Sequence, residues 1–146
     1  MIIYLAAPFF NPEQMATVFA VEGAIERAGH ELITPRKRGP TLKDLSPEDR
    51  KMAAAKVFST NCLDIERCEA VCAVIDDRDP GTIWEMGYAY RASKKIYSYT
   101  AYAYGVNVML QGCILGHAKG VAELAEMMHR IKVGSSLEKF KLEAAT

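Results

Sequence analysis

Length, composition and charge restrict the classes of protein to which this chain can belong. It has 146 residues, half of them apolar, and its 18 lysines and arginines balance its 18 aspartates and glutamates. This length suits one domain of ordinary size. Zero net charge excludes binding to nucleic acid or to an anionic membrane through an overall positive charge. The four cysteines form no C-x-x-C pair and the three histidines are dispersed, so we expect reduced thiols, no metal and no cofactor.

The chain begins with an apolar run, Ile2–Ala7, which predicts a first strand. No basic region precedes this run, and it is too short for a signal peptide or a membrane span, so we expect a cytoplasmic protein. Asn11 and Pro12 are typical of an N-cap followed by the first helical residue. Apolar residues then recur with a helical period up to a stop at Gly29, and Glu31–Thr34 is the second predicted strand.

A polar loop at residues 36–46 is long for a compact domain, which indicates a functional loop. A helix from Pro47 to Glu66 follows, because serine, proline and two acids precede its apolar pattern. Val71–Ile75 is the third predicted strand. A helix is expected at Thr82–Ser93 and a fourth strand at Lys95–Ser98.

The last part of the chain has weaker patterns. Residues 99–105 form an aromatic loop, and residues 106–111 predict a short helical turn. We expect a fifth strand at Cys113–Gly116 and a helix over residues 121–131. Residues 134–146 form a C-terminal tail that is either a short helix or an arm.

Strands that alternate with helices predict a single α/β domain with a parallel sheet covered on both faces. Five strands at this length favour a flavodoxin-like, doubly wound sheet. In such a sheet ligands bind beyond the carboxyl ends of the strands. Three segments should therefore share one edge: Ala7–Asn11, Asp76–Gly81 and Tyr99–Asn107.

Acidic residues gather in one of these segments and just after it. Asp79 precedes Pro80 and Gly81, and Glu85 follows in the first turn of the expected helix, where the helix N-terminus favours its charged form. Alone, Asp79 could serve only the turn, and Glu85 could serve only as a partner of the helix dipole. Asp76 and Asp77 are interpreted as turn or surface acids.

Three further residues are ordinary when each is taken alone. Asp64 would be a surface acid, Tyr4 a core aromatic, and Asn107 a helix cap. Together with Asp79 and Glu85 they indicate carboxylate chemistry without a metal. Paired carboxylates suit glycosyl-bond cleavage, in which one attacks or stabilises the anomeric carbon and the other protonates the leaving group.

Three stretches of the sequence resemble the nucleoside 2-deoxyribosyltransferase family. They are Tyr4-Leu5-Ala6-Ala7-Pro8-Phe9-Phe10, Asp79-x-Gly81-Thr82-x-x-Glu85-x-Gly87-x-Ala89 and Asn107-x-Met109. The resemblance spans roughly residues 2–111, and it implies that residues 1–146 form one deoxyribosyltransferase-like domain. It also implies a homo-oligomer that uses no cofactor. Its partners would be deoxynucleosides and free nucleobases, and its reaction would move a deoxyribosyl group between bases in nucleoside salvage.

The resemblance also implies roles for single residues. Glu85 is similar to the nucleophile that forms a covalent deoxyribosyl intermediate, and Tyr4 to the hydroxyl that orients it. Asp79 and Asp64 resemble the acids near the sugar and base, with Asp64 as the expected proton donor. Substrate-binding roles are implied for Phe10, Gly81, Asn107 and Met109. Asn107 resembles the amide that a neighbouring subunit lends, and Phe9, Phe10 and Trp84 would exclude water from the site.

Two alternatives stay open. The first is a relative that hydrolyses nucleosides or nucleoside 5′-monophosphates, and the monophosphates would need a phosphate site. The first loop lacks serine and arginine, but the basic run Arg36–Arg38 could reach a phosphate. A non-catalytic nucleotide-binding module is the other alternative, because the fold alone would permit it.

Overall fold

A five-stranded parallel sheet forms the centre of the molecule. The computed structural model describes residues 1–39, 42–102 and 105–143. The strands are β1 (Ile2–Ala6), β2 (Glu31–Ile33), β3 (Ala70–Val74), β4 (Lys95–Thr100) and β5 (Gly116–Lys119). They lie in the order β2-β1-β3-β4-β5, and each neighbouring pair is parallel. This order confirms the predicted flavodoxin-like sheet and sets its topological switch point between β1 and β3.

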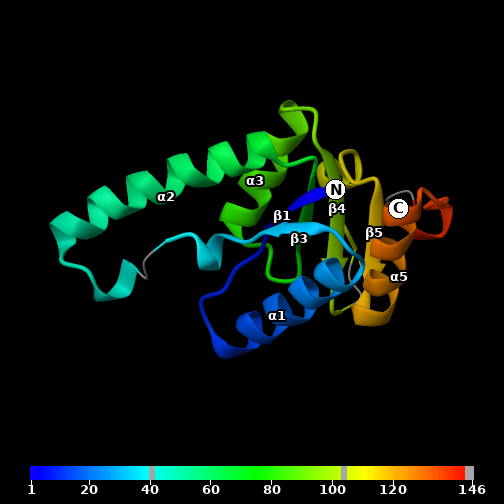
Figure 1. Cartoon of the computed structure of the whole chain (residues 1–146), viewed down its shortest axis with the longest axis horizontal. Helices are drawn as coiled ribbons and strands as arrows, with labels where there is room; N and C mark the ends of the chain where they lie inside the picture. The colour runs from blue at the N-terminus through cyan, green and yellow to red at the C-terminus, as the bar shows by residue number, and fades with distance from the viewer. Residues whose placement is uncertain (40–41, 103–104, 144–146) are drawn as a thin grey trace.

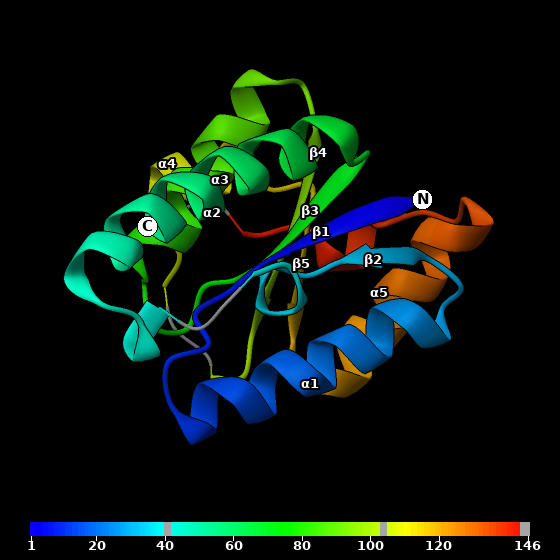
Figure 2. The ribbon, with the colours of Figure 1, turned by 60° about the vertical axis from the view of Figure 1, so that its left-hand side comes forward.

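Helices cover both faces of the sheet (Figure 1). The first face carries α1 (Pro12–Arg27) and α5 (Gly120–Val133), and the other carries α2 (Pro47–Arg67) and α3 (Pro80–Arg91). A one-turn helix, α4 (Val108–Gln111), follows β4. Figure 2 shows the strands between these layers. The N-terminal half of α2 extends beyond the rest of the molecule (Figure 1). None of the described helices is long and apolar enough to cross a membrane.

The same local signal starts three of the helices. Asn11, Ser46 and Asp79 are the N-caps of α1, α2 and α3, and each side chain accepts a hydrogen bond from the backbone N–H three residues later. In each case the next residue is a proline, whose fixed φ and missing N–H suit the first helical position. Because Asp79 and Pro80 form this cap, α3 begins two residues before the expected Thr82.

Alternation along β1 divides the core between the two faces. Ile3 and Leu5 pack against α1 and α5, whereas Tyr4 and Ala6 belong to the cluster beneath α2 and α3. All four are almost completely buried. Since side chains of a strand point to opposite faces in turn, this register directs the one polar side chain of β1 toward α2 and α3.

The fifth strand is displaced from its predicted position. Cys113 lies in a turn after α4, where its N–H donates to Leu110 O (3.1 Å). Pairing with β4 starts only when Leu115 N–H donates to Ile96 O (2.8 Å). The prediction of Cys113–Gly116 was wrong because the apolar run there closes this turn. β4 is also longer than predicted, and its last residues, Tyr99 and Thr100, are buried.

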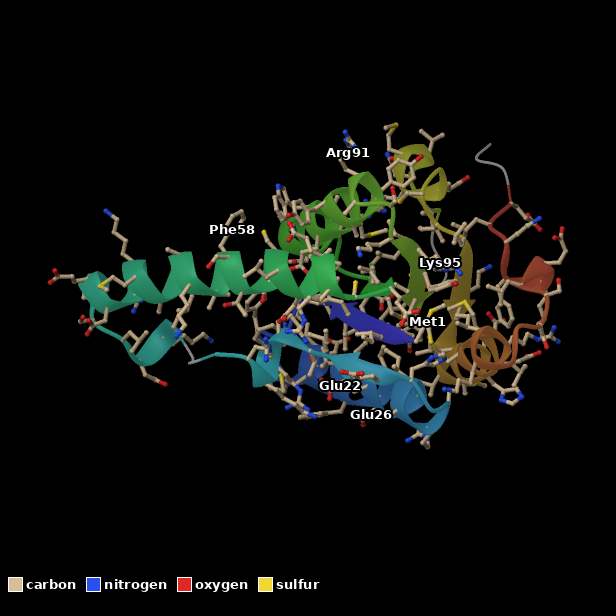
Figure 3. The ribbon with its side chains drawn as sticks, turned by 45° about the horizontal axis from the view of Figure 1, so that its top comes forward. Met1, Glu22, Glu26, Phe58, Arg91 and Lys95 are labelled. Atoms are coloured by element: carbon tan, nitrogen blue, oxygen red, sulfur yellow. The ribbon has the colours of Figure 1, made fainter. Side chains whose placement is uncertain are left out.

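The long loop after β2 contains two single turns of 3-10 helix, η1 (Pro35–Lys37) and η2 (Leu42–Asp44). Residues 40–41 of this predicted loop, 103–104 of the aromatic loop and 144–146 of the tail lie outside the described residues. We call residues 34–39 the strap. Arg36 on the strap donates two hydrogen bonds, of 2.7 and 2.6 Å, to the buried carboxylate of Glu22. Glu22 projects from α1 beside β2 (Figure 3).

The described part of the tail packs against the core, and Phe140 is its fully buried residue. Gly134 ends α5 in the left-handed conformation (φ 74°), and η3 (Glu138–Phe140) follows. Phe140 is 2% exposed and packs in the cluster of α1 and α5. A Cβ on Gly116 would lie 3.6 Å from Cβ of Phe140, so the ring is seated close to β5.

We therefore predict that Phe140→Ala destabilises the whole domain. The lost burial and the remaining cavity should lower the free energy of unfolding by about 3 kcal/mol. Urea denaturation followed by circular dichroism would measure it. Ser135→Ala, at an exposed position of the same tail, is the control and should change little. An unaltered midpoint for Phe140→Ala would show that the tail does not contribute to stability.

Candidate active site

Tyr4 lies at the centre of the sheet, where β1 pairs with both β2 and β3. It is opposite Ile33 on one side and Val71 on the other. The side chain is 0% exposed. Burial is the largest cause that raises the pKa of its hydroxyl, followed by the charge of Glu85. The hydroxyl therefore stays protonated and is available as a hydrogen-bond donor.

Glu85 approaches Tyr4 from α3. Because α3 begins at Pro80, Glu85 lies in the second helical turn and not in the first, where the helix dipole acts most strongly. Burial raises the pKa of its carboxyl from 4.5 to about 7, the nearby Tyr4 hydroxyl lowers it, and the charge of Asp79 raises it. The expected bias toward the ionised form is thus wrong, because loss of hydration outweighs the stabilising effect of the Tyr4 hydroxyl.

Two polar atoms at this point have no partner. The Tyr4 hydroxyl and Oε2 of Glu85 are buried, and neither makes a hydrogen bond of regular geometry to any residue that the structure describes. A buried polar atom without a partner costs about 1–3 kcal/mol, so such atoms are rare in folded proteins. The two atoms lie beside each other, and both groups have strongly raised pKa values. This combination is typical of a site that a ligand completes.

Asp79 contributes a second carboxylate at the start of α3. Its Oδ2 accepts hydrogen bonds from the backbone N–H (2.8 Å) and the hydroxyl (3.1 Å) of Thr82. Oδ1 accepts none from the described residues. A Cβ on Gly81 would lie 3.1 Å from Oδ2, so a larger residue there would press on the capping carboxylate. One oxygen of Asp79 is therefore free to bind a ligand.

Asp64 has a different environment from the one implied by a proton-donor role. It lies in the last turn of α2 with its side chain 2% exposed. Arg38 on the strap donates from Nε to Oδ2 and from Nη2 to Oδ1, both at 2.9 Å, and Arg67 lies 3.6 Å from Oδ1. The charge of Asp64 also raises the pKa of Tyr4. Asp64 is thus near the site, but both its oxygens are occupied.

The predicted substrate-binding residues are spread over the surface. Phe10 is 63% exposed and stacks on Phe9. Asn107 is exposed, and its side chain caps α4 by accepting the N–H of Met109 (2.8 Å). Met109 is 79% exposed. Within one chain, these side chains make no hydrogen bond to Glu85 or Tyr4 among the described residues.

Trp84, expected as an apolar wall, lies on α3 where that helix faces α2. It stacks on Tyr88, with ring centroids 5.2 Å apart, and also contacts Phe58 of α2. Figure 3 shows Phe58 on α2 at the side of α3. Trp84 is 47% exposed, so its ring packs over the contact between the two helices and remains partly open to solvent.

Two contacts near the site could not be found in the sequence. The Arg38–Asp64 pair joins residues 26 positions apart, and its only signal was the basic run in a long loop. Cys62 of α2 is half-buried, and its pKa is raised by burial first and then by the charges of Glu66 and Glu85. Cys62 therefore lies close to the candidate nucleophile.

Comparisons with known proteins concern the family and the fold of the chain. Residues 3–142 match the family described as nucleoside 2-deoxyribosyltransferase. Among solved structures, a 2-deoxyribosyltransferase from Bacillus psychrosaccharolyticus is similar at 23% identity over all of both chains, with a TM-score of 0.78. A conserved protein from Enterococcus faecalis V583 is similar at 17% identity over 90% of this chain and 98% of its own, with a TM-score of 0.70. A CMP N-glycosidase from Clostridium botulinum is similar at 16% identity over 88% and 98%, with a TM-score of 0.61. No curated protein matches the chain.

The raised pKa of Glu85 predicts a particular dependence of stability on pH. A carboxyl whose pKa is higher in the folded than in the unfolded state contributes stability below the unfolded value, and this contribution is lost as the pH rises through about 7. The total loss should be of the order of 3 kcal/mol. Urea denaturation at pH 5 and pH 8 should therefore show a larger decrease for the native chain than for Glu85→Gln. Equal decreases would mean that Glu85 is not buried as described.

Proposed function

The chain belongs to the nucleoside 2-deoxyribosyltransferase family, and we propose that it transfers the deoxyribosyl group of 2′-deoxynucleosides to other nucleobases. The observation that carries this proposal is the pair of buried, unpartnered atoms at Tyr4 and Glu85. Tyr4 lies on β1, and Glu85 lies on α3, the helix that follows β3. β1 and β3 are the two strands at the switch point of the sheet. Ligands of doubly wound sheets bind beside that point.

In the proposed reaction the Glu85 carboxylate attacks C1′ of the deoxyribose. The C1′–N bond breaks, its electron pair stays on the base, and the base takes up a proton as it leaves. A second base then attacks C1′ of the covalent intermediate, loses a proton, and releases the carboxylate. A pKa near 7 leaves about half of Glu85 ionised at neutral pH, and the positive charge that develops on the sugar favours the ionised form.

Tyr4 has a role that its surroundings support. Its hydroxyl is a neutral donor beside Glu85 and lowers the pKa of that carboxyl. Donation to one carboxylate oxygen would hold the other toward C1′. Burial of both groups also keeps water away from the intermediate, and water would otherwise convert transfer into hydrolysis.

The proton for the leaving base has two candidate sources. Asp64 is the proton donor that the sequence predicts, but Arg38 binds both of its oxygens, so Arg38 would have to move. Asp79 is the other candidate because its Oδ1 accepts no hydrogen bond from the described residues and its charge already acts on Glu85. We keep Asp64 as the proposed donor, with Asp79 binding the sugar.

The remaining assignments concern the surroundings of the reaction. We propose that Phe10, Gly81, Asn107 and Met109 bind the substrate. Asn107 would act in the site of a neighbouring subunit of a homo-oligomer, because it lies exposed at the start of α4. Salvage of nucleosides in the cytoplasm, without a cofactor, fits this chemistry.

Hydrolysis of nucleoside 5′-monophosphates remains the second candidate, because a CMP N-glycosidase shares the fold. Two of the three cations in the basic run that could hold a phosphate are already engaged. Arg36 is paired with Glu22 and Arg38 with Asp64, and both carboxylates are buried. A substrate phosphate could meet the exposed Lys37, but to bind either arginine it would have to displace one of these pairs, which favours unphosphorylated nucleosides.

The first test is a transfer assay. With deoxyinosine and free adenine, the native chain should form deoxyadenosine, measured by liquid chromatography. Glu85→Gln should lose at least about 10³-fold in kcat, because the nucleophile is removed. The control is Glu26→Gln, which makes the same change at an exposed glutamate. Products formed only from 5′-monophosphates would contradict the proposal, and so would a fully active Glu85→Gln variant.

A second test identifies the proton donor. The base of 7-methyl-2′-deoxyguanosine leaves as a neutral molecule and needs no proton. Loss of a general acid should therefore lower the rate of transfer from deoxyinosine by about 10²-fold or more. The rate with the methylated substrate should change little. We expect this pattern for Asp64→Asn. The ratio of the two rates on one variant is unaffected by its folded fraction. If Asp79→Asn alone shows the pattern, Asp79 is the donor.

A further inference from the structure

The proposed chemistry uses Asp79 but neither of the acids that open the same loop. The structure assigns both of them contacts. Asp76 accepts the N–H of Ala101 at 2.9 Å on Oδ1 and 3.0 Å on Oδ2, and it accepts the N–H of Tyr102 at 3.3 Å. β4 ends at Thr100, so these are the first two amides beyond the strand. Asp76 therefore joins the exit of β3 to the exit of β4.

These contacts continue into the first loop of the chain. The Tyr102 hydroxyl donates to Oε1 of Glu13 (3.1 Å), at the start of α1. The next residue, Gln14, donates from Nε2 to Oδ2 of Asp77 (2.8 Å). Oε1 of Gln14 accepts the backbone N–H of Phe10 (2.8 Å). The three loops at the carboxyl edge are thus linked by hydrogen bonds.

We call these linked residues the rim network: Phe10, Glu13, Gln14, Asp76, Asp77, Ala101 and Tyr102. Several of its side chains line a hollow of about 120 Å³ on the α1 side of the edge. The network connects three segments that carry proposed site residues. Phe10 is a member, Asp79 lies three residues after Asp76, and Asn107 and Met109 follow Tyr102 along the chain.

Asp76 and Asp77 contribute unequally to this network. Asp76 is half-buried and binds two backbone amides, whose positions fix the path of the chain. Asp77 is exposed, and among the described residues it makes one hydrogen bond, with the Gln14 side chain, which can rotate away. Hydrogen bonds to a charged group are about twice as strong as neutral ones, and backbone contacts order a segment more effectively than a surface side chain does.

We propose that Asp76 is a positioning residue, which holds Ala101 and Tyr102 where the chain leaves β4 and so helps to place Asn107 and Met109 for substrate binding. The proposal rests on the proposed function, because that function gives Asn107 and Met109 their role. Asp76 touches no reacting atom in this scheme. Its loss should therefore weaken binding of substrate and transition state equally, which raises KM and leaves kcat almost unchanged.

Kinetics of three variants test this role. Asp76→Ala should raise the KM for deoxyinosine about 10-fold or more, with kcat within about two-fold of the native value. Asp76→Asn keeps one acceptor oxygen and should restore part of the loss. Asp77→Ala removes the same charge from the neighbouring residue and should change KM by less than about three-fold. Equal effects at the two positions would overturn the proposal, because charge alone would then explain them.

Two further measurements do not depend on turnover. Amide hydrogen exchange, followed by mass spectrometry of peptides that contain Ala101 and Tyr102, should be faster in Asp76→Ala than in Asp77→Ala. Calorimetry with deoxyinosine in a Glu85→Gln background should show weaker binding when Asp76→Ala is added. Faster exchange with unchanged affinity would overturn the positioning role. Absence of transfer by the native chain would instead overturn the proposed function, and the affinity comparison would still decide the role of Asp76.

Discussion

Burial of the Glu85 carboxyl beside the Tyr4 hydroxyl is the constraint on which the site depends. Removal from water raises the pKa of Glu85 to about 7, although a hydroxyl donor is close by. At neutral pH the fold therefore holds a carboxyl group that is only partly ionised, next to a tyrosine whose raised pKa keeps it protonated. Such an arrangement costs stability, and a domain of this size keeps it only if the surrounding core is well packed.

The packed core holds both Tyr4 and Glu85 in place. Tyr4 lies between two paired strands with fully buried neighbours, and Met86, the residue after Glu85, is 0% exposed. Thr82 is 2% exposed and binds Asp79 by two hydrogen bonds, so the start of α3 is seated against the sheet. The site is consequently built on a strand and a capped helix, and only its surroundings depend on loops. Elements of this kind hold side chains more accurately than loops do.

Local signals in the sequence were sufficient for most of the fold. Alternating apolar runs and cap-proline pairs predicted the sheet order, α1 and α2, and the parallel topology brought residues 7–11 and 76–81 to one edge. The fifth strand was misplaced because the apolar run at Cys113 serves a turn, and a run that short cannot distinguish the two. The helix was expected from Thr82 although Asp79 and Pro80 form its cap, which is why Glu85 was expected one turn too early.

The site residues Tyr4, Asp64, Asp79 and Glu85 could be chosen from the sequence, but their electrostatic states could not. The state of Asp64 depends on Arg38, which lies 26 residues earlier, on the other side of a long loop and of most of α2. The state of Glu85 depends on how deeply α3 is seated, which is a property of packing. Sequence patterns record which side chains share a face, whereas burial and ion pairing depend on distances between elements.

The two arginines of the strap show why this difference matters for mechanism. Arg36 and Arg38 are two residues apart, and each binds both oxygens of a buried carboxylate. Glu22, the partner of Arg36, lies on the α1 face, so that pair only ties the strap to the domain. Asp64, the partner of Arg38, lies on the face of Tyr4, and its charge acts on the Tyr4 hydroxyl. A proton donor at Asp64 therefore requires the strap to release the Arg38–Asp64 pair. A donor at Asp79 requires no such movement, because its Oδ1 accepts no hydrogen bond from the described residues. The leaving-group dependence of the two aspartate variants consequently also reports whether the strap takes part in the reaction.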